Sequence, residues 1–172
     1  MTPPLSHAWL CQQIVDESRD AIIFADRRGV IRLWNRGAEE IFGHPAEAAL
    51  GQSLDLIIPE PLRDRHNQGY QRVMATGQTK YGKELLAVPG VRQDQARTSL
   101  EFSITLIKDD QGLVLGSAAI IRDVTARWSQ ERERQRRLAD LEEGSVDLPL
   151  DLRRAGDLLH PQGPFHRHAG RR

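Results

Sequence analysis

The strongest constraint on the fold of this chain is the strict alternation in "TSLEFSITLI", residues 98–107. Apolar side chains at Leu100, Phe102, Ile104 and Leu106 alternate with polar ones. Because successive side chains of a strand point to opposite faces, this pattern predicts a half-buried antiparallel strand. The turn "KDDQG" follows, and "LVLGSAAIIRD" returns as an almost wholly apolar strand. A sheet with one apolar face must be covered by other elements on that face.

The first half of the chain predicts two more strands and the helices that cover the sheet. "AIIFADRRGVIRLWN" holds two β-branched and aromatic runs, residues 21–25 and 30–34, around a turn with Gly29 at a positive φ. Asn35 is predicted to cap the helix that follows, and a charged helix is predicted over residues 61–76. A further, weakly alternating strand is expected over residues 80–89. We therefore expect an α+β fold with short helices on one face of an antiparallel sheet.

Composition and charge exclude several classes of function. With 24 basic and 24 acidic side chains the net charge is zero, so we expect no direct binding to nucleic acid. No apolar run approaches the ~20 residues that span a bilayer, and no signal peptide is apparent, which predicts a cytoplasmic protein without membrane contact. The single Cys11 agrees with a reducing compartment. No nucleophile with a histidine and a carboxylate has a recognisable spacing, so we expect no enzymatic activity.

Changes in composition divide the chain into four segments. A short amphipathic helix is expected within residues 1–18, and the sheet with its covering helices within residues 19–125. Residues 126–143 predict a charged helix, because charges dominate "ARWSQERERQRRLADLEE". Residues 144–172 contain proline and glycine without a sustained period, which is typical of a mostly disordered tail.

Three motifs carry a resemblance to a known family. They are the hairpin "ADRRGVIRLWN", the helical segment from "EEIFGH" to "LGQ", and "RDVT" at residues 122–125. Together they resemble the PAS family of sensory domains over roughly residues 16–127. The resemblance implies the PAS fold, a five-stranded antiparallel sheet with short helices covering one face, a cavity between them, and flanking N- and C-terminal helices. PAS domains commonly lie upstream of kinases, cyclases or transcription factors, but no output domain follows here, so we expect a stand-alone sensory or protein-interaction module.

The segment "PEPLRDRHNQGYQR", residues 59–72, bears one histidine, His66. From the residues alone, a lone histidine on such a helix is more often a surface or rim residue than an iron ligand. The segment is, however, similar to the histidine-bearing helix of haem-binding PAS domains in oxygen-sensing bacterial kinases and phosphodiesterases. That resemblance implies a haem b cofactor with His66 as the proximal iron (metal) ligand, and it places Arg65 and Tyr70 in the binding set.

The same resemblance assigns residues to the gas-binding side of a haem. Lys83 stands where the haem-binding domains have a distal arginine, and Phe102 and Ile104 match the apolar positions that crowd the gas. Lysine offers one hydrated charge on a flexible stem instead of a planar fork, so oxygen would be stabilised more weakly. Many PAS domains without haem share a similar pattern in this helix, where the histidine only forms hydrogen bonds.

The sequence thus leaves two functions open. One is a module that senses a small ligand or gas through haem, and the other is a ligand-free adaptor for dimerisation or partner docking in a transcriptional or two-component pathway. In both cases we expect an unidentified signalling protein as partner. A homodimer is also expected, because Trp128 and the N-terminal Trp9, Leu10 and Ile14 could pair across a two-fold axis, as the flanking helices of PAS dimers often do.

Overall fold

The computed structural model describes residues 5–79 and 85–143. Lys83, the start of the strand expected over residues 80–89, and the tail expected over residues 144–172 lie outside the described residues. The chain forms two compact units, Met1–Arg132 and Glu133–Arg172. The sheet, its covering helices and every candidate binding residue named above fall in the first unit.

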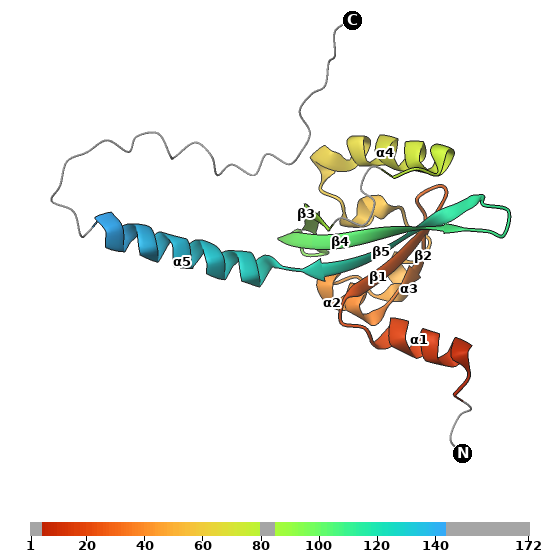
Figure 1. Cartoon of the computed structure of the whole chain (residues 1–172), viewed down its shortest axis with the longest axis horizontal. Coiled ribbons are helices and arrows are strands. Elements are labelled where there is room, and N and C mark those ends of the chain that lie inside the picture. Colours follow the sequence, from red (N-terminus) through yellow and green to blue (C-terminus); the bar gives the residue numbers. More distant parts are fainter. Residues whose placement is uncertain (1–4, 80–84, 144–172) are drawn as a thin grey trace, which may run out of the picture. The chain divides into compact units, whose positions relative to one another are not determined.

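Strands and helices follow one another in the expected order (Figure 1). Two strands come first, several short helices follow, and three strands and a long helix complete the described chain. The elements are α1 (His7–Glu17), β1 (Ala21–Asp26), β2 (Ile31–Trp34), α2 (Arg36–Phe42), α3 (Ala46–Ala49), the 3-10 helices η1 (Leu54–Ile57) and η2 (Glu60–Leu62), α4 (Arg63–Thr76), β3 (Leu86–Val91), β4 (Arg97–Lys108), β5 (Val114–Asp123) and α5 (Thr125–Glu143).

The five strands form one antiparallel sheet in the order β2-β1-β5-β4-β3. The alternating segment is β4, which pairs with the apolar β5 on one side and with β3 on the other. β5 lies at the centre of the sheet, as its almost continuous apolar run predicted. The structure therefore confirms the predicted five-stranded antiparallel sheet and the α+β class.

The hydrophobic core lies between one face of the sheet and the short helices that follow β2. Ile23 and Ile121 of the sheet and Phe42 of α2 are almost fully buried in one cluster, in which the ring centroids of Phe42 and Trp34 lie 5.6 Å apart. We call this covered side the inner face. Its buried cluster also contains Ala21, Ile31, Ala38, Ala49, Ile57 and Leu100.

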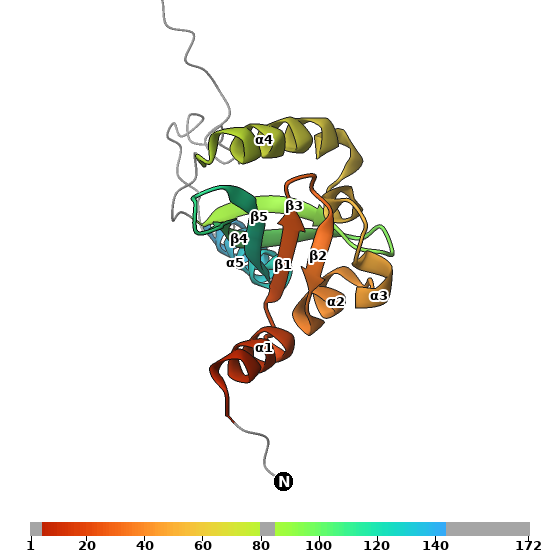
Figure 2. The same ribbon diagram turned by 90° about the vertical axis from the view of Figure 1, so that its right-hand side faces the viewer.

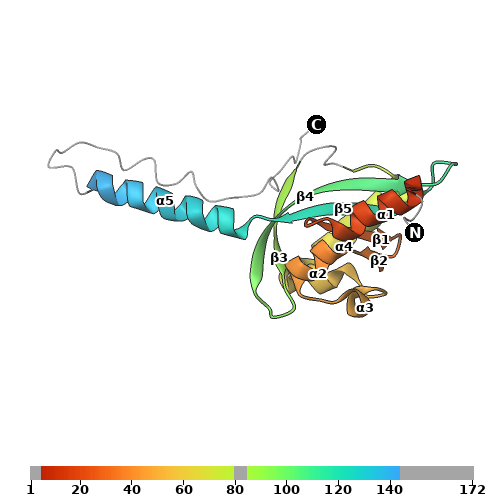
Figure 3. The same cartoon turned by 90° about the horizontal axis from the view of Figure 1, so that it is seen from below.

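Helix α4 lies near the end of the sheet at the β1–β2 turn (Figures 1 and 2). It is a polar helix, and Met74 is the one fully buried residue of its completely described length. Helix α1 contacts α2 (Figures 2 and 3), and none of its residues, all of them described, is fully buried. Both helices therefore rest on the domain with few apolar contacts.

Asn35 joins α1, β1 and α2. Its Oδ1 atom accepts hydrogen bonds from the backbone N–H of Ile22 (2.8 Å) and Ala38 (3.0 Å), so Asn35 caps α2 as the sequence predicted. Its Nδ2 atom donates to the carbonyl oxygens of Val15 (2.8 Å) and Asp20 (3.0 Å). Because the side chain is 3% exposed, these bonds replace water for buried backbone groups and fix how α1 leaves the domain.

Candidate functional site

Helix α4 presents the candidate ligand, His66. Its boundaries follow from local sequence, since the 3-10 turn of η2, with Pro61, precedes it and Gly77 ends it with a φ of 66°. His66 and Tyr70 are four residues apart, so they share one face of the helix. Their rings stack with centroids 6.0 Å apart and planes 30° from parallel.

His66 is a half-buried imidazole with an oriented ring. Its Nδ1 atom lies 3.3 Å from Oδ1 of Asn67, and Nδ2 of Asn67 donates to Oδ1 of Asp55 at 3.0 Å. Burial lowers the pKa of His66 below its ordinary value, although the Asn67 hydrogen bond and the Asp55 charge act in the opposite direction. At neutral pH the ring is therefore neutral, which is the form that binds metals, and Asn67 can accept the Nδ1 proton and leave Nε2 for a ligand.

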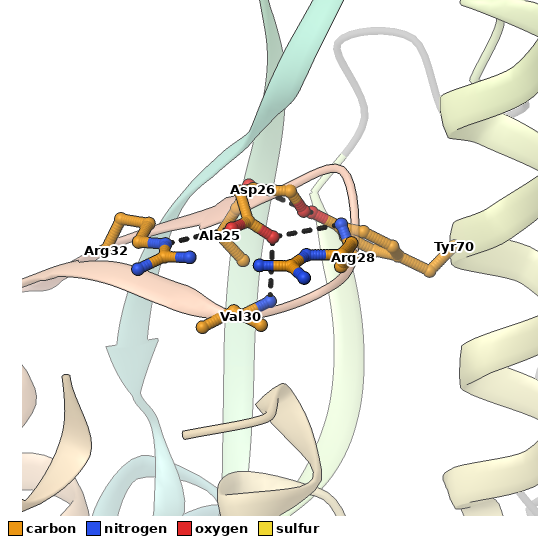
Figure 4. Close-up of polar contacts among 6 residues, drawn as sticks. All are labelled: Ala25, Asp26, Arg28, Val30, Arg32 and Tyr70. Atoms are coloured by element: carbon orange, nitrogen blue, oxygen red, sulfur yellow. Dashed lines mark hydrogen bonds and ion pairs between the residues drawn. The ribbon is translucent and has the colours of Figure 1, made fainter. Parts of the chain in front are cut away.

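Tyr70 ties α4 to the sheet. Its hydroxyl lies 2.9 Å from the carbonyl oxygen of Ala25 and 2.7 Å from that of Asp26, and donates its proton between them (Figure 4). Burial, together with the negative charge of Asp26, raises the pKa of Tyr70 to about 12. The hydroxyl therefore stays protonated at physiological pH and is already used in bonding the backbone of β1.

Asp26 shapes the turn that receives Tyr70 (Figure 4). Its Oδ1 atom accepts the N–H groups of Arg28 (2.9 Å) and Val30 (3.1 Å), and its Oδ2 accepts Nε of Arg32 (2.8 Å). Burial raises the pKa of Asp26, but these hydrogen bonds outweigh it and leave the pKa below its ordinary value. The sequence predicted the turn but not this role, although an aspartate that opens a turn is a known signal for such bonds.

Phe102 and Ile104 lie on the inner face of β4, opposite Ile121 and Ala119 of β5. Both are half-buried, whereas Leu100 on the same face of the same strand is 4% exposed. Phe102 packs against the buried cluster. The inner face is thus covered less completely at Phe102 and Ile104 than at Leu100.

The structure brings some predicted site residues together and leaves others apart. His66 and Tyr70 stack on α4, Phe102 and Ile104 share a strand face, and Arg65 is exposed. One open hollow is bordered by residues that include Asp20, Ile120 and Arg122, and another, beside the start of α4, is bordered by Gln52, Ser53, Asp55, Leu56 and Arg63. Among the described residues, no cluster of three or more His, Cys, Asp or Glu side chains could hold a metal ion.

Of the described residues that the resemblance assigns to a haem site, His66 is the one whose side chain could ligate the iron. The neutral ring and the Asn67 acceptor at Nδ1 fit the requirements of a proximal ligand. The Tyr70 hydroxyl does not take part, because backbone carbonyls of β1 already accept its proton.

The strand that carries Phe102 is attached to α5. The N–H of Ser99 donates to Oγ1 of Thr125 (2.9 Å), and Asp123 accepts both the N–H and the hydroxyl proton of Thr125. Arg127 in the first turn of α5 forms an ion pair with Glu101 of β4. Ser99 and Glu101 alternate with the inner-face residues of β4, and both contact the first turn of α5.

A search of the described ranges, 5–79 and 85–143, shows no helix whose length and apolarity would let it cross a bilayer.

Comparisons with known proteins agree with this architecture. The family described as "PAS fold" matches residues 15–128. The sensor protein FixL of Bradyrhizobium diazoefficiens is 29% identical over 129 residues, covering 75% of this chain and 24% of FixL. The histidine-protein kinase AtoS of Escherichia coli is 30% identical over 131 residues, covering 75% of this chain and 19% of AtoS. The chain thus spans about a quarter or less of the length of these relatives.

Solved structures share the fold. The PAS domain of a Colwellia psychrerythraea protein superimposes with a TM-score of 0.62 at 21% identity, covering 70% of this chain and 99% of that domain. The match of the family over most of the sheet and its helices decides the assignment. The chain belongs to the PAS family.

Proposed function

We propose that this PAS sensory module of signal transduction binds haem b through His66 and reports the state of the haem through α5. The observation that carries the proposal is the half-buried imidazole of His66, whose Nδ1 atom lies 3.3 Å from Oδ1 of Asn67. When bound, haem would supply an iron that can take up a diatomic gas. His66 would hold the iron, and Asn67 would keep the ring oriented.

The remaining residues of the proposed site have supporting roles. The half-buried side chains of Phe102 and Ile104 would offer apolar surface to the porphyrin and exclude water. Their strand also bears Ser99 and Glu101, which contact Thr125 and Arg127. FixL, a sensor protein, and AtoS, a histidine-protein kinase, are similar to this chain. We therefore propose that α5 contacts a signalling protein in the cytoplasm. We also propose that the module itself catalyses no reaction.

Visible absorption of the full-length protein tests the haem. After expression with a haem precursor, or after addition of haemin, we expect a Soret band that is lost in His66→Ala. His44→Ala is the matched control, since His44 is another partly buried histidine whose backbone oxygen, not its ring, bonds Trp34. A colourless wild-type protein, or a band that survives in His66→Ala, would contradict the proposal.

A ligand-free adaptor is the second candidate, and exposed apolar side chains favour it. Ile14 of α1 is 68% exposed, and Ile120, on the outer face of the sheet, is 51% exposed. Such surface is often buried against a second copy. Light scattering of the purified protein tests this, because a dimer that becomes monomeric in Ile14→Glu or Ile120→Glu, without any bound chromophore, supports the adaptor.

A further inference from the structure

The two ends of α4 are attached to the domain by different kinds of contact. At the C-terminal end, Met74 is 3% exposed, and a Cβ atom built on Gly77 would lie 3.4 Å from Cγ2 of Val114. This end therefore lies beside Val114 of β5 and buries the apolar side chain of Met74. Such packing cannot be released without exposing apolar surface to water.

The half of α4 that carries His66 is tied by side-chain hydrogen bonds. Asn67 donates to Asp55, and the Tyr70 hydroxyl donates to the carbonyl oxygens of Ala25 and Asp26. No residue from Arg63 to Tyr70, a fully described stretch, is fully buried. Hydrogen bonds can be exchanged for bonds to water at little net cost, so this half can separate from the sheet more easily than the C-terminal end.

Tyr70 makes the central contact between the His66 half of α4 and the sheet. Its ring stacks on His66 and lies against the β1–β2 turn, where a Cβ atom built on Gly29 would be 3.9 Å from Cε1 of Tyr70. The turn itself is fixed by Asp26 through Arg28, Val30 and Arg32 (Figure 4). If the hydrogen bonds of the Tyr70 hydroxyl to Ala25 and Asp26 were broken, the stacked rings of Tyr70 and His66 could therefore move away from this fixed turn.

We propose that the Tyr70 hydroxyl is a latch, and that its release lets the Arg63–Tyr70 half of α4 move away from the sheet and admit a small molecule to the inner face. Tyr70 is then a positioning residue for His66 and not a ligand-binding one. This inference rests on the proposed binding site at His66, but the latch is a property of the ligand-free protein and can be measured there.

The test compares ligand-free full-length Tyr70→Phe with wild type by hydrogen–deuterium exchange. Phenylalanine keeps the ring and its stack on His66 but removes the donor. We expect the amides of the first half of α4 to exchange about 5- to 30-fold faster, while those of β1 and β5 are unchanged. Thr76→Val is the matched control, because among the described residues its hydroxyl bonds Arg72 and Gln78, at the C-terminal end of α4, and no strand of the sheet.

A second comparison needs no variant. In wild type alone, the amides of α4 before Tyr70 should exchange faster than those of β1. Unchanged exchange of the α4 amides in Tyr70→Phe would overturn the latch.

Haemin uptake separates this inference from the proposed function. If wild type forms a Soret band through His66, Tyr70→Phe should take up haemin about 5- to 30-fold faster with the same final spectrum. If no band forms but α4 exchange rises in Tyr70→Phe, the haem proposal fails and the latch stands. If the band forms but neither exchange nor uptake changes, the latch fails and the haem site stands.

Discussion

At the scale of single residues, buried polar side chains determine how segments of the domain meet. Asn35 is the clearest case, because one amide group bonds backbone atoms of α1, β1 and α2 and of the residues between α1 and β1. The sequence identified it as a helix cap. Its bonds to Val15, Ser18 and Asp20 could not be predicted, because they depend on where the chain before β1 lies in space.

Replacing Asn35 by alanine should be strongly destabilising. The substitution leaves the N–H groups of Ile22 and Ala38 and several carbonyls without partners in a buried place, so we expect a loss of about 2 to 4 kcal/mol in the free energy of unfolding. Urea denaturation measures it. Asn67→Ala, at a half-buried position where the side chain bonds Asp55 and His66, is the control and should lose about 1 kcal/mol. Equal losses in the two variants would contradict the claim that the buried hydrogen bonds of Asn35 stabilise the fold more than those of Asn67.

Tyr70 predicts a loss of stability in alkali. Burial and the Asp26 charge raise its pKa to about 12 in the folded protein, whereas an unfolded tyrosine titrates near 10. A raised pKa means that the stabilisation is complete below about pH 10 and is lost as the pH rises toward 12. The ultraviolet absorbance of tyrosinate in Tyr81→Phe measures the pKa of Tyr70, because Tyr70 is then the sole tyrosine. An ordinary titration near 10 would show that the hydroxyl is not bonded as described.

At the scale of elements, periodicity marked most clearly the strand whose burial alternates and only weakly the strand whose burial does not. β4 was evident from its alternation, because one of its faces packs on the core. The strand expected over residues 80–89 overlaps β3, whose bounds are Leu86–Val91 among the described residues. It is an edge strand with Pro89 inside it, and most of its side chains are half-buried or exposed, so no alternation marks it.

Alanine substitutions at two glycines, one in a crowded place and one in open space, should change the stability of the protein in opposite directions. A Cβ atom on Gly116 of β5 would lie 2.2 Å from the carbonyl oxygen of Ala25 and 2.6 Å from the ring of Phe24. Gly116→Ala should therefore cost about 1 to 3 kcal/mol by forcing β1 and β5 apart. Gly69→Ala on α4 meets nothing within 4 Å and should stabilise by about 0.5 to 1 kcal/mol. Thermal unfolding distinguishes them, and the same sign for both would contradict this packing.

At the scale of the whole molecule, the sensory domain should fold without the end of the chain. The sheet, the buried cluster and the contacts of Thr125 and Arg127 all lie within Met1–Arg132. We expect a protein ending at residue 132 to keep the melting temperature of the full chain within about 3 °C. Shortening it to residue 124 removes the Thr125 hydroxyl that accepts from Ser99 and should lower the melting temperature. An unfolded 1–132 protein would contradict this division.

The contacts between α4 and the sheet at the candidate site could not be predicted from either element alone. The sequence and its family resemblance singled out His66, Tyr70, Phe102 and Ile104, and the structure places the first two in one stack and the last two on one strand face. Resemblance gave Tyr70 a place in the binding set. Only the fold shows that its hydroxyl bonds the backbone of β1, forty-five residues earlier in the chain.

The order of strands and helices, the antiparallel hairpins and the apolar face of β4 could be predicted from the amino-acid sequence, because they follow from local periodicity and from turns closed by nearby residues. Which polar groups meet across the chain depends on the folded structure. Asn35 with Val15, Tyr70 with Ala25 and Thr125 with Ser99 are hydrogen bonds whose partners become neighbours only after the sheet has formed. A hydrogen bond needs its partner within about 3 Å, and nothing in residue spacing along the chain reports that distance.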